Sequence, residues 1–339
     1  MYRYKNCQCF QILALCGFLC LFSSCKKEDP IPNTAIDNYN TLWKILDEKY
    51  CFFTYKNINW DSLYGVYLPK VKSARSDAQL FYVFGDLLSQ LKDGHVNLYS
   101  AFDVARYTQW YSDYPDNFSQ DLLDKYYLKK NYKIAAGLKY TILDRNVGYI
   151  RYSSFSSGIG NGNISAVLSY FKNCKGLILD IRNNGGGELV NGQLLASRFT
   201  EEKVLCGYML YKIGKGHDAF SEPNPIYLQA YSGQKWTKKV VVLTNRSCYS
   251  AANDFVNMMR YLPNVTLVGD KTGGGGGLPF SAELPCGWLL RFSASPTLDV
   301  QKKHIEGGIE PDIRVDLKES EIAQGRDAII EEGKRLIKL

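Results

Sequence analysis

Short apolar strands alternate with helix-patterned segments through the middle of the chain, and this alternation restricts the fold more than any other feature. Apolar runs of this kind are typical of parallel sheets that helices cover on both faces. The predicted strands are 140–143, 147–152, 176–181, 204–212, 239–244 and 265–269, and the predicted helices between them are 164–171, 188–199 and 250–261. The sequence therefore predicts an α/β core with a largely parallel sheet.

The remaining segments divide the chain around this core. Apolar residues recur at helical spacing from Tyr39 to Tyr50 and again over 77–91, and a helix over 61–68 is expected to end before Pro69. The predicted divisions are an N-terminal helical domain over 37–100, a connecting segment over 101–137, the α/β core over 138–318 and a C-terminal amphipathic helix over 319–339.

The first 25 residues have the composition of an export signal. Arg3 and Lys5 precede an apolar run over 12–22, which is shorter than the roughly 20 residues needed to span a bilayer. Small residues then precede Cys25 and a charged stretch, an arrangement that resembles the lipobox and surface-export signal of lipoproteins from the Bacteroidetes. The resemblance implies a signal peptide over 1–24, an acylated Cys25, a tether over 25–36 and an outer-membrane lipoprotein facing the periplasm or the cell surface. A plain secretory peptide cut nearby is the alternative.

Composition excludes several classes of protein. With 45% hydrophobic and 22% charged residues, the 339-residue chain is not of a disordered type. Its 41 basic and 34 acidic residues are spread along the chain, without the basic patch of a nucleic-acid-binding protein. Three histidines without an HExxH or CxxC pattern predict no metal site. The cysteines after Cys25 are expected to be mostly buried thiols; they are Cys51, Cys174, Cys206, Cys248 and Cys286.

Two turns between a predicted strand and a predicted helix contain residues suited to chemistry. The first is D-I-R-N-N-G-G-G over 180–187, whose glycines allow backbone N–H groups to point into a cleft and bind an anion or oxyanion. A tight turn that merely requires glycine is the alternative. The second is N-R-S-C-Y-S-A-A-N over 245–253, where Ser250 suits either a helix N-cap or an exposed nucleophile.

A third motif, L-K-D-G-H-V over 91–96, contains His95; a lone histidine is ordinarily structural or solvated. Together, the order L-x-D-G-H, D-I-R-N-N-G-G-G, S-A-A-N, V-G-D-K-T-G-G-G and G-G-I-E-P-D resembles the tail-specific (C-terminal processing) serine peptidase family. That family includes tricorn protease and the interphotoreceptor retinoid-binding protein repeats. The resemblance covers 38–318 and implies a crotonase/Clp-like catalytic core with an N-terminal helical domain. The segment 101–137 is too short to add the PDZ module of the processing branch.

The resemblance also implies roles for particular residues. Ser250 is expected to be the nucleophile, and the N–H groups of Gly185 or Gly186, together with that of Ala251, are expected to bind the oxyanion. The acidic position that the family has three residues after the serine is Asn253 in this chain.

The expected base is the point where this chain departs from many members of the family. The usual lysine position is occupied by Gly275, and Lys271 lies four residues earlier. His95 matches the histidine of the tricorn-like branch and could accept the serine proton near neutral pH. The resemblance further implies that Glu306 orients His95. His304 is a second choice for the catalytic histidine.

These features predict a serine peptidase that cleaves extracytoplasmic proteins or peptides through an acyl-enzyme. The expected partners are a peptide or unfolded protein substrate and, through the lipid anchor, a membrane; no nucleic acid, metal or cofactor is expected, and the oligomeric state is left open. The alternatives are a ligand- or peptide-binding protein on the same fold and a crotonase-type acyl enzyme. Glycines 273–277 are predicted to form a mobile cleft wall, 279–300 a hairpin turning at Cys286 and Gly287, and 213–237 a solvated loop.

Overall fold

The predicted α/β core is present as a seven-stranded sheet in the computed structural model, which describes residues 32–338. The strands follow the order β13-β10-β9-β6-β5-β4-β3, with parallel pairing from β13 to β5 and antiparallel pairing from β5 to β3. Their bounds are β3 Lys133–Ala135, β4 Leu138–Leu143, β5 Val147–Tyr152, β6 Leu177–Asp180, β9 Val240–Thr244, β10 Val265–Gly269 and β13 Ile313–Arg314. The predicted signal peptide and the predicted lipidation site Cys25 lie outside the residues that the structure describes.

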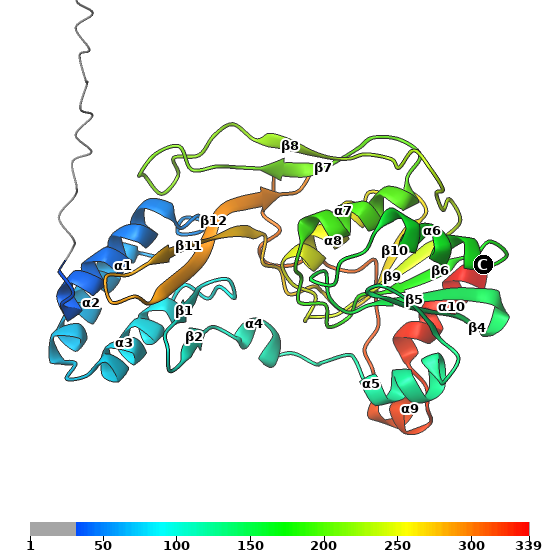
Figure 1. Ribbon diagram of the computed structural model, residues 1–339, viewed down its shortest axis with the longest axis horizontal. Coiled ribbons are helices and arrows are strands. Elements are labelled where there is room, and N and C mark those ends of the chain that lie inside the picture. Colours follow the sequence, from blue (N-terminus) through cyan, green and yellow to red (C-terminus); the bar gives the residue numbers. More distant parts are fainter. Residues whose placement is uncertain (1–31, 339) are drawn as a thin grey trace, which may run out of the picture. The chain divides into compact units, whose positions relative to one another are not determined.

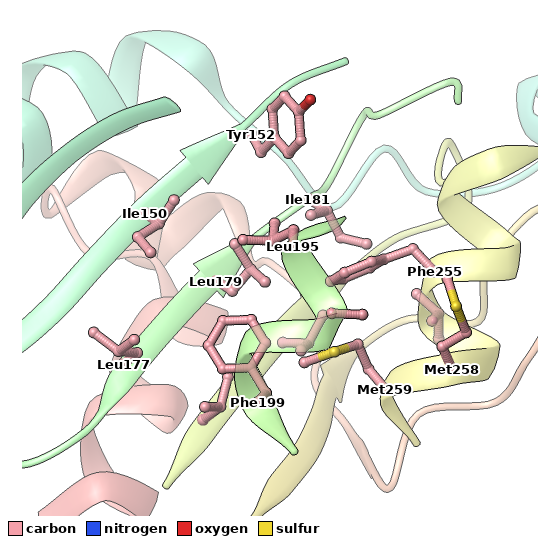
Figure 2. Close-up of a cluster of buried hydrophobic side chains, with 14 of the residues drawn as sticks. Ile150, Tyr152, Leu177, Leu179, Ile181, Leu195, Phe199, Phe255, Met258 and Met259 are labelled. Atoms are coloured by element: carbon pink, nitrogen blue, oxygen red, sulfur yellow. The ribbon is translucent and has the colours of Figure 1, made fainter. Parts of the chain in front are cut away.

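Helices bury both faces of the centre of this sheet, which explains why its central strands β6 and β9 are almost uninterruptedly apolar. Leu177 and Leu179 of β6 face a cluster that includes Phe255, whereas Ile178 between them faces the opposite side and Ile330. Figures 1 and 2 show the first face, over which α7 and α8 pack. The covering helices are α6 Asn161–Tyr170, α7 Leu189–Ala196 and α8 Ala251–Met259 on that face, and η1 Leu123–Leu128 and α10 Ala328–Lys338 on the other.

The N-terminal region is helical, as predicted, and each of its helices begins at a side-chain cap. Thr34, Asn59 and Ser76 accept hydrogen bonds from the first turns of α1 Ala35–Lys49, α2 Trp60–Ser73 and α3 Asp77–Ser89. The prediction that Pro69 ends the second helix is wrong, because α2 continues past it. Pro69 lacks an N–H donor, but Val71 beyond it is fully buried, and this burial offsets the missing hydrogen bond.

A second sheet joins the helical region to the core. Its strand order is β2-β1-β12-β7-β8, and β11 also pairs with β12 in a hairpin that turns at Cys286 and Gly287, as predicted. The segment predicted as a solvated loop contains β8, a short and mostly exposed strand that includes Pro225, a residue that disfavours a strand prediction. The bounds are β1 Asn97–Tyr99, β2 Val104–Arg106, β7 Val204–Met209, β8 Asn224–Leu228, β11 Gly277–Glu283 and β12 Leu289–Leu298.

The short elements connect these layers. The C-terminal segment forms two helices rather than one, because the backbone breaks at Gly325, which has a φ of 74°. The remaining short elements are α4 Gln109–Ser112, α5 Gln120–Leu122, η2 Asp144–Asn146, η3 Ser197–Phe199 and α9 Glu319–Ala323. None of the helices within residues 32–338 is long and apolar enough to cross a membrane. The five described cysteines are free thiols, and all but Cys286 are buried.

Candidate active site

The fold brings Ser250 and His95 together from opposite parts of the chain. Ser250 lies in the turn between β9 and α8, at the carboxyl end of the parallel strands, and His95 lies between α3 and β1. The Nε2 atom of His95 lies 2.9 Å from the Oγ atom of Ser250. This is the separation expected of a nucleophile and its general base.

The backbone of Ser250 distinguishes a nucleophile from a helix cap. Its φ of 56° and ψ of −126° are unusual for a residue with a side chain, and its hydroxyl makes no capping hydrogen bond to α8. A strained backbone at a turn between a strand and a helix can hold a nucleophilic side chain exposed. The side chain is therefore directed to His95 at the expense of the cap.

The glycine motif packs against this turn. A Cβ atom on Gly186, whose φ is 99°, would lie 2.9 Å from the Cβ atom of Ser250 and 2.7 Å from the carbonyl oxygen of Tyr249. Only glycine allows the two turns to approach this closely. On the other side, the N–H of Ser250 donates to the carbonyl of Gly274 at 2.9 Å, so the turn is held from two directions.

The backbone donors beside Ser250 differ in their availability. The N–H of Gly186 donates to the Oδ1 atom of Asn184 at 3.0 Å, so it is already engaged. By contrast, the N–H groups of Gly185 and Ala251 donate to no acceptor within residues 32–338. Gly185 also lines the same pocket as Ser250. Of the predicted oxyanion donors, Gly185 and Ala251 are thus the free pair.

His95 is buried beneath aromatic rings. The ring of Tyr249 lies 4.9 Å from that of His95 and stacks at 3.9 Å on the ring of Trp110. Burial lowers the pKa of His95 to about 4, although the negative charge of Asp93 opposes this shift. A neutral imidazole at physiological pH is the form that can accept the serine proton.

A buried charge cluster lies behind His95. Lys56 pairs with the Oε1 atom of Glu306 at 2.8 Å and with the Oδ2 atom of Asp93 at 3.5 Å. Asp93 also accepts a hydrogen bond from the backbone N–H of His95 and others from the hydroxyls of Tyr50 and Ser293. Asp93 is therefore the carboxylate that contacts His95 directly.

The position of Glu306 differs from the one implied by the resemblance. No hydrogen bond joins Glu306 to His95 in the part of the chain that the structure describes, and the Nδ1 atom of His95 and the Oε2 atom of Glu306 are both buried without a partner there. Burial raises the pKa of Glu306 to about 8, with a further contribution from Asp93 that Lys56 opposes. Among the contacts of the described residues, Glu306 is connected to His95 through Lys56 and Asp93.

The other candidate bases lie elsewhere. The ammonium of Lys271 pairs with Glu310 at 3.1 Å. The ring of His304 packs against those of Phe52 and Tyr55. Asn253, at the family's acidic position, is buried; its amide donates to the carbonyl of Ile305 and accepts from the hydroxyl of Thr272.

The glycine run 273–277 is not the mobile wall that was predicted. All five glycines are buried, and Gly275 donates to the carbonyl of Glu306 at 3.2 Å. A Cβ atom on Gly275 would come within 2.5 Å of the Tyr249 ring, and one on Gly274 would overlap the carbonyl oxygen of Glu306. The run therefore supports the catalytic turn by close packing.

Two charged residues of the site escaped the sequence analysis. Asp93 stands in the L-K-D-G-H motif, two residues before the histidine, and a carboxylate so close to a candidate base was a usable signal. Lys56 lies in the turn after α1, where nothing in the local sequence marks it. Only its ion pairs with Asp93 and Glu306 identify it as part of the site.

Comparison with known proteins finds two matching family models and a similar solved structure. Residues 146–315 match the family model described as Peptidase family S41, and residues 35–89 match that of the Tricorn protease C1 domain. A crystal structure of a peptidase from Parabacteroides merdae, itself described as putative, is 51% identical, with a TM-score of 0.87 over 90% of this chain and 97% of that one.

More distant relatives share parts of the chain or the fold alone. The carboxy-terminal processing protease CtpA of Bacillus subtilis is 28% identical over 176 residues, which cover 51% of this chain and 36% of that protein. The chain thus spans about a third of the length of the curated relatives it matches. Mature CPAF, at 13% identity, has the same fold with a TM-score of 0.67 over 90% of this chain and 96% of that one.

Proposed function

The chain belongs to peptidase family S41, and from this premise we propose that it is a serine peptidase with Ser250 as nucleophile and His95 as general base. The observation that carries the proposal is the 2.9 Å contact between the Oγ atom of Ser250 and the Nε2 atom of His95, made by a serine that caps no helix. Its substrates would be peptides or unfolded proteins.

Acylation follows from this contact. Ser250 attacks the carbonyl carbon of the scissile bond while its proton passes to the Nε2 atom of His95. The carbonyl oxygen becomes an oxyanion that accepts hydrogen bonds from the N–H groups of Gly185 and Ala251, each worth about 3 kcal/mol. His95 then donates the proton to the leaving amine, the C–N bond breaks, and an acyl-enzyme on Ser250 remains.

Deacylation uses the same groups with water in place of the serine. His95 removes a proton from a water molecule, which attacks the ester carbonyl of the acyl-enzyme. The second oxyanion occupies the same two N–H groups, and His95 returns the proton to Ser250 as the carboxylic acid leaves. This sequence consumes one water molecule and restores the starting protonation state.

We also propose roles for the carboxylates. Asp93 favours the imidazolium that forms on His95, because it is held as an anion next to the histidine: burial opposes its ionisation, but Lys56 keeps the pKa of Asp93 below its ordinary value. Glu306 keeps the orienting role that the family resemblance implies, and it exerts this role through Lys56 rather than by direct contact.

The proposed location is outside the cytoplasm, on a lipid anchor at Cys25. Its support is the apolar run over 12–22 that ends shortly before Cys25 and the charged stretch after it. Metabolic labelling with an alkyne-bearing fatty acid should label the wild-type chain but not Cys25→Ala. Equal labelling of the two chains would contradict the anchor.

Hydrolysis of unfolded casein by the purified full chain tests the peptidase proposal. Ser250→Ala and His95→Ala should each reduce the rate at least about a thousandfold. Ser247→Ala is the matched control, since this serine lies in the same turn, three residues from the proposed nucleophile, and should keep the wild-type rate. Hydrolysis that survives in Ser250→Ala would contradict the assignment.

A further inference from the structure

Two arginines line the pocket that contains Ser250 and His95. This pocket has a volume of about 310 Å³ and is lined by Arg106 and Arg291 as well as by His95 and Ser250. Neither arginine makes an ion pair or a side-chain hydrogen bond with any residue in the range 32–338. The pocket therefore contains two positive charges without a protein counter-ion.

The second sheet fixes these arginines as a pair. Asn97 of β1 stands directly opposite Arg106 of β2 and, on its other side, directly opposite Arg291 of β12. Residues opposite one another on adjacent strands point to the same face of a sheet. The two backbones are about 10 Å apart, since each strand spacing is about 4.8 Å. Two long arginine side chains can close that separation around one small anion.

The charge of Arg291 reaches the catalytic base. Burial is the main cause of the low pKa of His95, Asp93 opposes it, and Arg291 adds to the lowering. Arg291 is only partly buried and Arg106 is exposed, so both remain accessible to a ligand entering from solvent. An anion held here would lie in the same pocket as Ser250 and the bond that it attacks.

We propose that Arg106 and Arg291 form a subsite for a carboxylate of the peptide substrate. A guanidinium matches a carboxylate in shape and can donate two parallel hydrogen bonds to it, which a hydrated lysine does less well. The carboxylate is either the C-terminus of the substrate or an aspartate or glutamate side chain near the cleaved bond. This inference rests on the proposed peptidase function and specifies which substrates the site selects.

Matched peptides distinguish the two sources of carboxylate. One pair has the same sequence with a free acid or an amide at its C-terminus and no acidic side chain. A second pair has an amidated C-terminus and differs by Glu against Gln at each position in turn. Binding to the full-length Ser250→Ala protein is measured by fluorescence anisotropy, and hydrolysis by the active chain is measured in parallel.

The expected result is a preference of about tenfold to a hundredfold for one acidic peptide over its neutral partner, in dissociation constant and in kcat/KM. Arg106→Gln and Arg291→Gln should each reduce this preference, and the double variant should remove it. Arg75→Gln, on an exposed arginine with no ion pair in the described chain, is the control and should keep it. Raising the salt concentration should weaken binding of the acidic peptide more than that of the neutral one.

Two results would overturn the inference: equal or absent binding of acidic and neutral peptides, or an acidic preference that the double variant retains. Labelling by a fluorophosphonate probe separates this failure from that of the proposed function. A labelled chain without an acidic preference loses the subsite but keeps the peptidase. An unlabelled chain that binds acidic peptides through the arginines keeps the subsite and loses the peptidase.

Discussion

Two buried clusters in this protein each combine one basic and two acidic side chains. They differ in how many of their polar atoms have a hydrogen-bond partner. At the end of β6, Arg182 lies between Asp180 and Asp327, with contacts of 2.6 and 2.9 Å, and all three side chains are fully buried. Beside His95, Lys56 lies between Asp93 and Glu306, with contacts of 3.5 and 2.8 Å. Each cluster places one cation between two acidic side chains, although burial raises the pKa of Glu306 to about 8 and so keeps it mostly protonated at neutral pH.

The difference lies in the cation and in the atoms left unpaired. The planar guanidinium of Arg182 fixes the first cluster, and Asp327 also accepts N–H groups at the start of α10, so this cluster anchors the glycine motif to the fold. In the second cluster Lys56 is partly exposed and Glu306 keeps an unpaired oxygen. A satisfied cluster stabilises the fold, and an incompletely satisfied one next to a base tunes that base.

Removing the cation of the first cluster should have the largest effect on stability. Arg182→Met leaves two buried carboxylates with their backbone and hydroxyl donors but without their cation, so the free energy of unfolding should fall by about 3–5 kcal/mol. Urea denaturation measures this loss. Arg335→Met is the matched control, because the exposed Arg335 pairs with Glu332 on the surface; its loss should be much smaller than that of Arg182→Met. Equal losses in the two variants would contradict the comparison.

The second cluster and the burial of His95 together predict the pH profile. Because the pKa of His95 is lowered to about 4, the base stays neutral at every pH above that value. The acid limb of kcat/KM should therefore fall near pH 4, rather than near 6.5 as for an unperturbed histidine. Circular dichroism at each pH separates loss of the base from unfolding. An acid limb between pH 6 and 7 in a folded protein would be the contrary result.

Replacing Lys56 should affect both stability and the base, and this combination separates the two clusters. Lys56→Met should lower the free energy of unfolding by about 1–3 kcal/mol, less than Arg182→Met, because Lys56 is 13% exposed. Its charge lowers the pKa of His95, so the acid limb of kcat/KM should move to higher pH. Lys56→Arg keeps the charge and should restore the limb. A loss of stability with an unmoved limb in Lys56→Met would show a purely structural role.

Glu306→Gln should have the smallest effect. With a pKa of about 8, Glu306 holds its proton through most of the neutral range, and glutamine is a neutral replacement of the same shape. The change in unfolding free energy should stay below about 1 kcal/mol, and kcat should fall less than in Asp93→Asn. Parallel kinetics of the two variants measure this order. A loss of kcat in Glu306→Gln as large as that in His95→Ala would contradict this order and would support direct orientation of His95 by Glu306, as the family resemblance implies.

The sequence was most informative where structure is local. The apolar runs of β5, β6, β9 and β10 predicted a parallel sheet. A strand of such a sheet is buried on both faces, and this makes its own sequence apolar regardless of which strands it pairs with. The turn at Ser250 was visible as small residues between a strand and a helix. Pro69 shows the limit of such reasoning, since the packing of Val71 overrides a helix-breaking residue.

Contacts between distant segments could not be predicted in the same way. Ser250 and His95 are 155 residues apart, and the family resemblance, not the local pattern, brought them together before the structure did. Nothing in the sequence pairs Lys56 with Glu306 or sets Arg106 across from Arg291. The pairing of strands and charges that lie far apart in the sequence depends on how the whole chain folds, and local spacing does not specify it.

The central claim is that His95 activates Ser250 for covalent attack. The most direct test is to treat the full chain with a fluorophosphonate probe at pH 7 and locate the adduct by peptide mass spectrometry. The account predicts one adduct on Ser250 that forms much more slowly in His95→Ala and is absent in Ser250→Ala. An adduct on Ser247, or an undiminished rate in His95→Ala, would contradict it.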